Sequence, residues 1–327
     1  MIGWYVHDHG SGHLQRLQCI APLLTTPVTA LSSSPRPAGF VGGWVRLASD
    51  RPVGHDREVT AGGTLHWAPL HHPGLRERMG SIAAWVAAHR PTLMVVDVSA
   101  EVAVLVRSMG VPVVVVAMRG DRTDRAHRTA YDLATALLAP WPADLAEPWP
   151  VSWTAKTWHV GALSRHDGLL VQPAPDTRQV AVLWGQGGSA VTRSEVAAAA
   201  AASPDWTWTV AGFDASWLQD TWSLLRGSDV VVTQAGQNVV AEVAAARRPA
   251  VVVPQPRPFR EQEATAAVLA RAELAVVRPS WPSQECWPTL LDDAQHLGGA
   301  GWARWSDGRG ASRAAALLDE AASCEQP

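Results

Sequence analysis

Short, continuous apolar runs recur along the chain and alternate with segments in which apolar residues repeat at helical spacing. The Val-rich runs are "LMVVDV" (93–98), "VPVVVVAM" (111–118), "VAVLWG" (180–185), "WTWTVAG" (206–212), "DVVVT" (229–233) and "PAVVVP" (249–254). Such runs are typical of strands buried on both faces of a parallel sheet. Helical stretches lie between them, at 101–110, 194–203 and 238–248. The alternation predicts an α/β fold of doubly wound parallel sheets.

A proline-rich, irregular stretch at 139–179 separates an N-terminal α/β set from a C-terminal one. The chain has 327 residues, a length that suits two hydrophobic cores better than one. We therefore expect an N-terminal domain over residues 1–165 and a C-terminal domain over 166–308. The segment "GASRAAALLDEAAS" (310–323) predicts an amphipathic helix that has no following strand.

Charge and cysteine content narrow the classes of protein that fit. A net charge of −3 provides no basic field for nucleic acid, so no nucleic-acid partner is expected. The three cysteines are far apart and odd in number, which predicts neither a disulfide framework nor a zinc site. The chain shows no signal pattern and no apolar run of about 18 residues. We expect a cytoplasmic protein, and peripheral contact with the inner face of the membrane stays open.

Two glycine-rich turns leave predicted strands and enter predicted helices of the C-terminal half. They are "WGQGGSAVTRSE" (184–195) and "TQAGQNVVAE" (233–242). Backbone N–H groups at a helix N-terminus bind phosphate, and two such turns in one domain suit a diphosphate. The candidate phosphate-binding residues are Gly187, Gly188, Ser189, Gly236, Gln237 and Asn238. Neither turn is a Walker loop or a dinucleotide fingerprint, and tight turns alone also explain each glycine cluster.

The stretch "SDVVVTQAGQNVVAEVAAARRPAVVVPQPRPFREQEATAAVL" (228–269) resembles the C-terminal domain of the glycosyltransferase family that includes the peptidoglycan enzyme MurG, glycosyltransferase family 28. The resemblance is specific over 180–278. In the N-terminal half it rests on "GSGH" (10–13), which is similar to the family's glycine-rich loop. It implies a GT-B fold, in which two Rossmann-like domains face a cleft and the C-terminal helix (309–327) packs back on the N-terminal domain.

The resemblance also implies roles for residues that bind a nucleotide-sugar donor. Gly188, Ser189 and the turn at 236–238 would contact the phosphates, and Glu242 the ribose hydroxyls. Glu261 and Gln262 would hold the sugar, with Trp217 and Leu218 beside the base. The sequence departs from the family where Glu261 replaces a second glutamine, which leaves the sugar open. Gln237 and Asn238 also stand where small or apolar residues are common.

A glycosyl transfer needs a base for the acceptor hydroxyl, and imidazole titrates near neutral pH. His13 stands where the family places its loop histidine, so we expect it to be the base, although a lone histidine is also a common packing residue. Asp97, at the end of "LMVVDV", either orients that imidazole or caps the helix that begins near Ala100. Gly10, Ser11 and Gly12 would line the acceptor side.

The segment "MRGDRTDRAHRTAYD" (118–132) concentrates arginines after another predicted strand. Arg119 within it is the candidate contact to an anionic acceptor, such as a lipid-linked phosphate. An ordinary solvated charged face is the other interpretation, and it is the favoured one.

The sequence contains no DxD-type carboxylate pair and no cluster of metal-ligand spacing, so no metal and no separate cofactor are expected. The leading hypothesis is a metal-independent, inverting glycosyltransferase that uses a nucleotide-sugar, most simply a UDP-sugar. The acceptor, whether lipid-linked or a small metabolite, is left open. The loop "GSGHLQR" also resembles the "GTGHVMR" loop of the MurG-like hydrolase of pseudaminic acid biosynthesis, which makes a nucleotide-sugar hydrolase the second hypothesis. A non-catalytic nucleotide-sugar-binding protein is the third.

Overall fold

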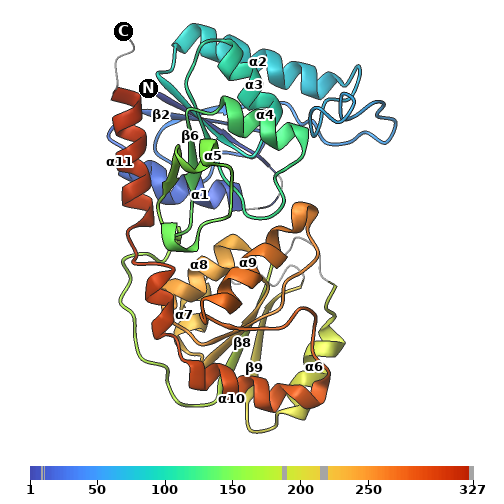
Figure 1. The fold of residues 1–327 in the computed structure, drawn as a ribbon, viewed down its shortest axis with the longest axis vertical. Coiled ribbons are helices and arrows are strands. Elements are labelled where there is room, and N and C mark those ends of the chain that lie inside the picture. Colours follow the sequence, from blue (N-terminus) through green and yellow to red (C-terminus); the bar gives the residue numbers. More distant parts are fainter. Residues whose placement is uncertain (9, 11, 186–189, 214–219, 324–327) are drawn as a thin grey trace.

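The computed structural model describes residues 1–8, 10, 12–185, 190–213 and 220–323, which form two α/β domains stacked along the long axis of the molecule (Figure 1). The N-terminal sheet has seven parallel strands in the order β3-β2-β1-β4-β5-β6-β7. Their bounds are β1 Ile2–Val6, β2 Val28–Ser32, β3 Gly43–Arg46, β4 Leu93–Asp97, β5 Val113–Val116, β6 Ala136–Ala139 and β7 Thr157–His159.

The helices of this domain cover both faces of the sheet. They are α1 Gly12–Ile20, α2 Pro73–His89, α3 Ala100–Ser108, α4 Arg125–Leu133 and the short α5 Val151–Thr154. The strand order reverses between β1 and β4, which are paired in register from Ile2 to Val6. Ligands of open parallel sheets bind where the order reverses, beyond the carboxyl ends of the strands. The loops that follow β1 and β4 therefore occupy the position expected for a site.

The C-terminal sheet repeats this plan with five parallel strands in the order β12-β11-β10-β8-β9. The strands are β8 Gln179–Trp184, β9 Thr207–Gly212, β10 Val230–Thr233, β11 Ala250–Val252 and β12 Val276–Val277. Its helices are α6 Arg193–Ala202, α7 Thr221–Arg226, α8 Gln237–Ala246, α9 Glu261–Arg271 and α10 Trp287–Leu297. Here the order reverses between β8 and β10, the two strands that the glycine-rich turns follow. The predicted fold class, two doubly wound parallel sheets, is confirmed.

The last helix, α11 (Gly310–Ser323), runs beside the N-terminal domain (Figure 1). Ala314 and Leu318 are fully buried in one hydrophobic cluster with Trp4 and Leu17. The Asp319 carboxylate accepts the backbone N–H of Thr25 at 2.8 Å. The chain thus returns from the C-terminal domain to the N-terminal core.

One part of the chain is more ordered than its sequence predicts. The stretch at 139–179, expected to be irregular, contains α5 and the edge strand β7, whose Trp158 pairs with Leu138 of β6. This strand has three half-buried residues and no apolar run, so its pattern carries little signal. The position near 165 falls in the connection between β7 and β8.

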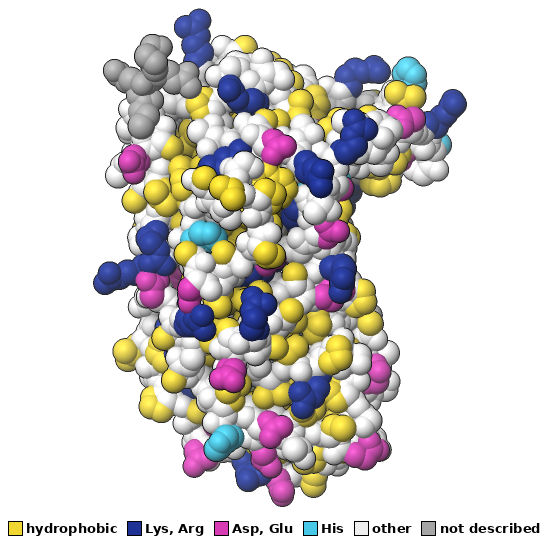
Figure 2. All heavy atoms as spheres, in the orientation of Figure 1, with side chains coloured by type: hydrophobic (Ala, Val, Ile, Leu, Met, Phe, Trp, Pro, Cys, Tyr) yellow, Lys and Arg dark blue, Asp and Glu magenta, His cyan; other side chains and the backbone are white. Residues whose placement is uncertain are grey.

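Charge is dispersed on the face that Figure 2 shows, where Lys and Arg side chains are interspersed with Asp and Glu rather than gathered in one patch. Within the described part of the chain, no helix combines the length and the apolar character that a membrane crossing needs.

Candidate active site

His13 and Asp97 meet at the reversal point of the N-terminal sheet. His13 lies in the first turn of α1, directly after β1, and its Nδ1 is 2.8 Å from Oδ1 of Asp97 at the end of β4. The Asp97 side chain is fully buried. The alternative role of Asp97, capping α3, belongs instead to Ser99, whose hydroxyl accepts the N–H of Val102 at 3.2 Å. The structure therefore joins the two residues that the sequence singled out as a catalytic pair.

Arg16 completes this cluster and was not among the site residues predicted from the sequence. Its guanidinium donates from Nε to Oδ2 of Asp97 at 2.9 Å and from Nη2 to Oδ1 at 2.7 Å. The same Nη2 lies 2.7 Å from Nδ1 of His13, and the residue is 3% exposed. Arg16 follows His13 by three residues, the spacing that places two side chains on one helix face. This spacing is the feature of the sequence that could have identified Arg16 as a partner of His13.

The charge on Asp97 is stabilised by its two partners. Burial alone raises the pKa of a carboxyl, but the nearby Arg16 and His13 outweigh it and hold the pKa of Asp97 well below its usual range. Asp97 is therefore ionised at any physiological pH. With Nδ1 of His13 engaged by this cluster, Nε2 is the nitrogen left to exchange a proton.

The first turn of α8 faces this cluster from the C-terminal domain (Figure 1). Nη1 of Arg16 donates to Oε1 of Gln237 at 2.6 Å, and Nδ2 of Asn238 donates to Oε1 of Gln15 at 2.7 Å. The approach is close, because a Cβ on Gly12 would lie 3.4 Å from Nδ2 of Asn238. We call this set of bonds between α1 and α8 the polar contact.

The N-terminus of α8 has the properties of an anion site. Gly236 is its N-cap residue, and no side chain caps the helix. The N–H groups of the first turn have no partner within the helix, and the helix dipole favours negative charge there. The predicted phosphate-binding residues Gly236, Gln237 and Asn238 thus lie opposite His13.

Glu242 lies one turn further along α8 and is 5% exposed. Its Oε1 accepts Nε2 of Gln15 at 3.0 Å and pairs with Nε of Arg165 at 3.0 Å. Its Oε2 accepts the hydroxyl of Thr221 at 2.9 Å. Burial raises the pKa of this carboxyl, but hydrogen bonding from His166 and the charge of Arg165 outweigh it and lower the pKa. The carboxylate is charged, and a ribose would have to exchange with these partners.

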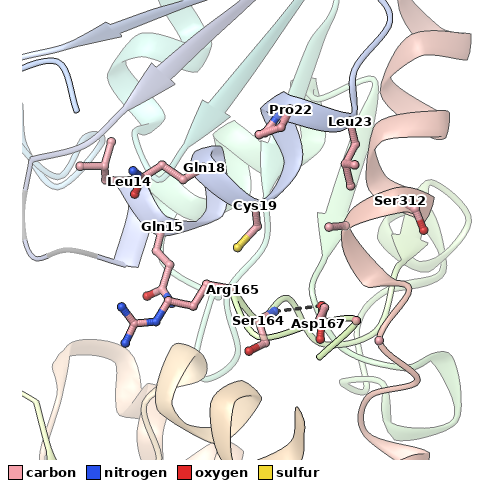
Figure 3. A pocket seen from close by; sticks show the side chains of 13 residues that line it. Leu14, Gln15, Gln18, Cys19, Pro22, Leu23, Ser164, Arg165, Asp167 and Ser312 are labelled. Carbon is pink, nitrogen blue, oxygen red and sulfur yellow. Dashed lines mark hydrogen bonds between the residues drawn. The ribbon is translucent and has the colours of Figure 1, made fainter. Parts of the chain in front are cut away.

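A cavity of about 640 Å³ lies between α1, the connection at 164–168 and the start of α11, and two partners of Glu242 line it. Figure 3 shows Gln15 and Arg165 at its wall, together with Cys19 from α1 and Ser312 from α11. Burial raises the pKa of the Cys19 thiol to about 12, so this sulfur is an unreactive neutral group. The cavity gives the Gln15 and Arg165 side chains space to move if they leave Glu242.

The two residues expected to hold the sugar differ in their surroundings. Gln262 is 4% exposed, and its amide accepts the N–H of Gln255 at 2.8 Å and donates to Gln234 at 2.9 Å. Glu261, the first residue of α9, is partly exposed, and its charge acts on Arg16. Glu261 is therefore better placed than Gln262 to contact a donor sugar without first breaking internal hydrogen bonds.

Arg119 does not line the cleft as expected. It is 4% exposed and lies between the rings of Trp141 and Trp305, with its guanidinium carbon 4.6 and 5.2 Å from the two centroids. It pairs with Glu147 and donates to the carbonyl of Leu145 at 2.7 Å. Neither the acceptor role nor the solvated-face interpretation fits this residue, because its guanidinium is buried against two tryptophans and is already bonded to Glu147 and Leu145.

Several predicted site residues lie outside the described residues. They are Ser11 of the first loop, Gly187, Gly188 and Ser189 of the first glycine turn, and Trp217 and Leu218 beside the expected base. Gly10 is described and has φ +78°, a conformation that favours glycine.

A second contact joins the domains at the loop before α9. The Phe259 ring lies 4.6 Å from that of His127 and 5.3 Å from that of His66, centroid to centroid. The Phe259 carbonyl accepts the N–H of Asp121 at 2.7 Å. Gly120 has φ +96°, and a Cβ there would lie 2.3 Å from that carbonyl oxygen. We call this the aromatic contact.

Among the described residues, His66, Asp124 and His127 form one group whose ligand atoms lie close enough to hold a metal ion. The hydrogen bonds among these side chains favour a hydrogen-bonded chain over a metal site. Arg122 Nη1 lies 3.0 Å from Nε2 of His127, so this nitrogen accepts and Nδ1 carries the proton toward Asp124. Burial lowers the pKa of His127 to about 4. A metal on Nδ1 would move that proton to Nε2, against the Arg122 donor.

Comparisons with known proteins agree with this architecture. Residues 212–280 match the glycosyltransferase family 28 C-terminal domain. No curated protein matches the chain. Among solved structures, the glycotransferase of kitacinnamycin is similar with a TM-score of 0.68 and 18% identity, covering 98% of both chains.

Two further solved structures extend this likeness. MurG of Acinetobacter baumannii is similar with a TM-score of 0.63 and 14% identity over 98% of this chain and 99% of its own. An Arabidopsis thaliana protein in complex with UDP has a TM-score of 0.70 and 16% identity over the same shares. The predicted GT-B fold is thereby confirmed, and the match over residues 212–280 agrees with the resemblance to glycosyltransferase family 28 that the sequence indicated.

Proposed function

We propose that the protein is an inverting glycosyltransferase that moves a sugar from a nucleotide-sugar to a hydroxyl acceptor, with His13 as the base. The observation that supports this most strongly is the cluster of His13, Asp97 and Arg16, which contacts the uncapped N-terminus of α8 through Gln237. A base on one domain and an anion site on the other are the two parts that such a transfer needs.

In the proposed reaction the N-terminal domain supplies the base and the C-terminal domain binds the leaving diphosphate. Nε2 of His13 takes the proton of the acceptor hydroxyl as its oxygen attacks the anomeric carbon. The bond from that carbon to the diphosphate breaks on the opposite face, which inverts the centre. Asp97 stabilises the imidazolium that forms, as carboxylates do in other acid-paired histidines. The N–H groups at the start of α8 receive the charge of the diphosphate.

We propose UDP as the nucleotide, because residues 212–280 of the donor-side domain match the family 28 model and a structural neighbour was solved with UDP. The ribose hydroxyls would replace Gln15 and Arg165 as partners of Glu242. The charge of the leaving group is met by the helix N-terminus and by hydrogen-bond donors, so turnover should survive EDTA. Loss of activity on chelation, restored by Mg²⁺ or Mn²⁺, would overturn the metal-independent part of this proposal.

A cavity of about 170 Å³ in the N-terminal domain is the proposed entry for the acceptor. His7 lines it, and the His7 and His13 rings lie 5.7 Å apart, centroid to centroid. Aromatic and apolar side chains form part of its wall, together with Asp8, Asp50, Glu101 and Arg51. Arg78 pairs with Asp50 at 2.9 Å, so three carboxylates face two arginines. This lining fits a neutral or cationic acceptor with an apolar body better than a lipid-linked phosphate.

A nucleotide-sugar hydrolase is the second candidate. It is favoured by Arg16, because the histidine and arginine of "GSGHLQR" reproduce the spacing of the "GTGHVMR" loop that the sequence resembles. In that reaction a water molecule takes the place of the acceptor, and His13 removes its proton in the same way.

The test measures nucleotide release from a panel of UDP-sugars, with and without a panel of phenolic and amino-alcohol acceptors. Release that depends on an acceptor and yields a glycoside is the expected result. Strong release without any acceptor would replace the transferase with the hydrolase. Tight binding without release would contradict both catalytic proposals and support a binding protein.

A further inference from the structure

One guanidinium bridges the proposed base and the proposed donor site. Arg16 donates Nε and Nη2 to the two oxygens of Asp97, at 2.9 and 2.7 Å, and Nη1 to Gln237, at 2.6 Å. Asp97 belongs to the N-terminal sheet and Gln237 to the first turn of α8. A planar guanidinium carries several N–H donors in fixed directions, as such a bridge requires. The ammonium of lysine has one nitrogen and cannot span the same partners.

The bridge also reaches His13. Nη2 of Arg16 lies 2.7 Å from Nδ1 of the imidazole, and that nitrogen is 2.8 Å from Oδ1 of Asp97. A shift of the guanidinium therefore changes which atom faces Nδ1. Oε1 of Gln237 accepts a hydrogen bond from Nη1 of the same guanidinium, so one side chain links the donor turn to the ring of His13.

We propose that Arg16 is a positioning residue that couples occupancy of the donor site to the state of His13. This inference rests on the proposed function. A diphosphate bound at the N-terminus of α8 is a stronger acceptor for Nη1 than the neutral amide of Gln237, because hydrogen bonds between ionised groups are shorter and stronger. Nη1 then moves from Gln237 to a phosphate oxygen, and the guanidinium turns relative to Asp97 and His13.

The alternative is that Arg16 only neutralises the buried charge of Asp97. Both roles predict that removing the arginine destabilises the protein, because Asp97 would be left buried and unpaired. Only coupling predicts that a change at Gln237 or at the donor phosphate reaches the His13 ring through Arg16. The readout must therefore be the ring itself.

The first experiment needs no ligand. Long-range ¹H–¹⁵N NMR spectra of the histidine rings are compared for the wild type, Gln237→Leu, Arg16→Lys and the double variant, with the His13 signals assigned from His13→Gln. Gln237→Leu should shift the His13 ring signals in the wild-type background and leave them unchanged in the Arg16→Lys background. Gln18→Leu, an exposed change on the same helix, is the matched control and should shift neither. Equal shifts in both backgrounds would overturn the coupling.

The second experiment adds UDP to the same proteins. UDP should shift the His13 ring signals in the wild type and in Gln18→Leu but not in Arg16→Lys. Arg16→Lys should also bind UDP about 10-fold to 100-fold more weakly, the effect expected for one hydrogen bond to a charged group. Unchanged UDP affinity together with a full His13 response in Arg16→Lys would overturn the inference. If the wild type binds neither UDP nor another nucleoside diphosphate, the proposed function itself is overturned. The first experiment, which uses no UDP, would still test the coupling.

If Arg16→Lys does not fold, the variants Gln237→Leu and Gln237→Glu still test whether Arg16 couples the donor site to His13. Gln237→Glu keeps an acceptor and strengthens the bond to Nη1, so UDP should then shift the His13 ring signals less than in the wild type. Gln237→Leu removes the acceptor and should shift them before UDP is added. Identical His13 signals in both variants and the wild type, with and without UDP, would contradict the coupling.

Discussion

The polar contact and the aromatic contact join the domains through different chemistry. The polar contact consists of long side chains on α1 and α8, each of which has an oxygen or nitrogen that a ligand can replace. The aromatic contact consists of the Phe259 ring among two imidazoles and one backbone hydrogen bond at 2.7 Å, which a soluble ligand does not reproduce. The first contact can exchange partners with a donor, and the second holds the loop before α9 against the N-terminal domain.

This difference indicates that the polar contact serves donor binding and the aromatic contact fixes the relative position of the domains. Donor binding need not separate the domains, because Gln15, Arg16 and Arg165 can pass their bonds to phosphate and ribose while the aromatic contact remains. The residues that begin α9, with Glu261, should then keep their position beside Arg16. Variants that disrupt one contact and spare the other should therefore separate affinity for nucleotide from the relative position of the domains.

The largest effect on stability is expected away from both contacts, where α11 packs on the N-terminal domain. Leu318 is fully buried, so Leu318→Ala should lower the free energy of unfolding by about 2–5 kcal/mol through lost burial and a cavity. Chemical denaturation measures this loss. Ala316→Ser, an exposed change on the same helix, is the control. UDP affinity of the folded variant should equal that of the wild type, and a parallel loss of affinity would show that α11 acts on the donor site.

Acid should weaken the aromatic contact next. The pKa of His127 is lowered from 6.5 to about 4 in the folded protein, mainly by burial. As pH falls below about 6.5 the unfolded chain binds this proton and the folded chain does not, so stability is lost between about pH 6.5 and 4, by at most about 3 kcal/mol. His127→Gln should flatten the unfolding free energy across this range. A variant with the wild-type slope there would exclude His127 as the cause.

Glu242→Ala tests the polar contact at its ribose end. Loss of a hydrogen bond between a charged carboxylate and the ribose should weaken UDP binding by about 1.5–3 kcal/mol, roughly 10-fold to 100-fold. Isothermal titration with 2′,3′-dideoxy-UDP supplies the control, because this ligand lacks the hydroxyls and should lose little. Equal losses for both ligands would remove the ribose role from Glu242.

The smallest effect is expected from Gly120→Ala, which changes only the aromatic contact. The new Cβ would meet the Phe259 carbonyl oxygen, and the backbone has φ +96°. We expect a cost of about 1–2 kcal/mol in unfolding free energy, with a larger radius of gyration by small-angle scattering. Gly80→Ala, on an exposed part of α2 where the added Cβ has open space, is the matched control. An unchanged radius would show that the aromatic contact does not hold the domains together.

Much of the fold could be predicted from the sequence, because Val-rich runs and helical periodicity are local properties. The pairing of His13 with Asp97 was also accessible, since both follow strands whose carboxyl ends meet at one edge. The partners of Glu242 and Gln262 were not, because Gln15 reaches Glu242 from the other domain and Gln262 is bonded by Gln234 and Gln255 from other loops of its own domain. The prediction for Arg119 was wrong, because an arginine-rich segment indicates exposure or anion binding, and here two tryptophans bury its guanidinium.

The most direct test of the central claim is a pair of measurements on His13→Ala and the wild type, UDP titration and steady-state turnover of a UDP-sugar. If His13 is the base, the variant should bind UDP as the wild type does and turn over about 10²-fold to 10⁴-fold more slowly. Wild-type turnover in the variant, or a defect confined to UDP binding, would contradict the account.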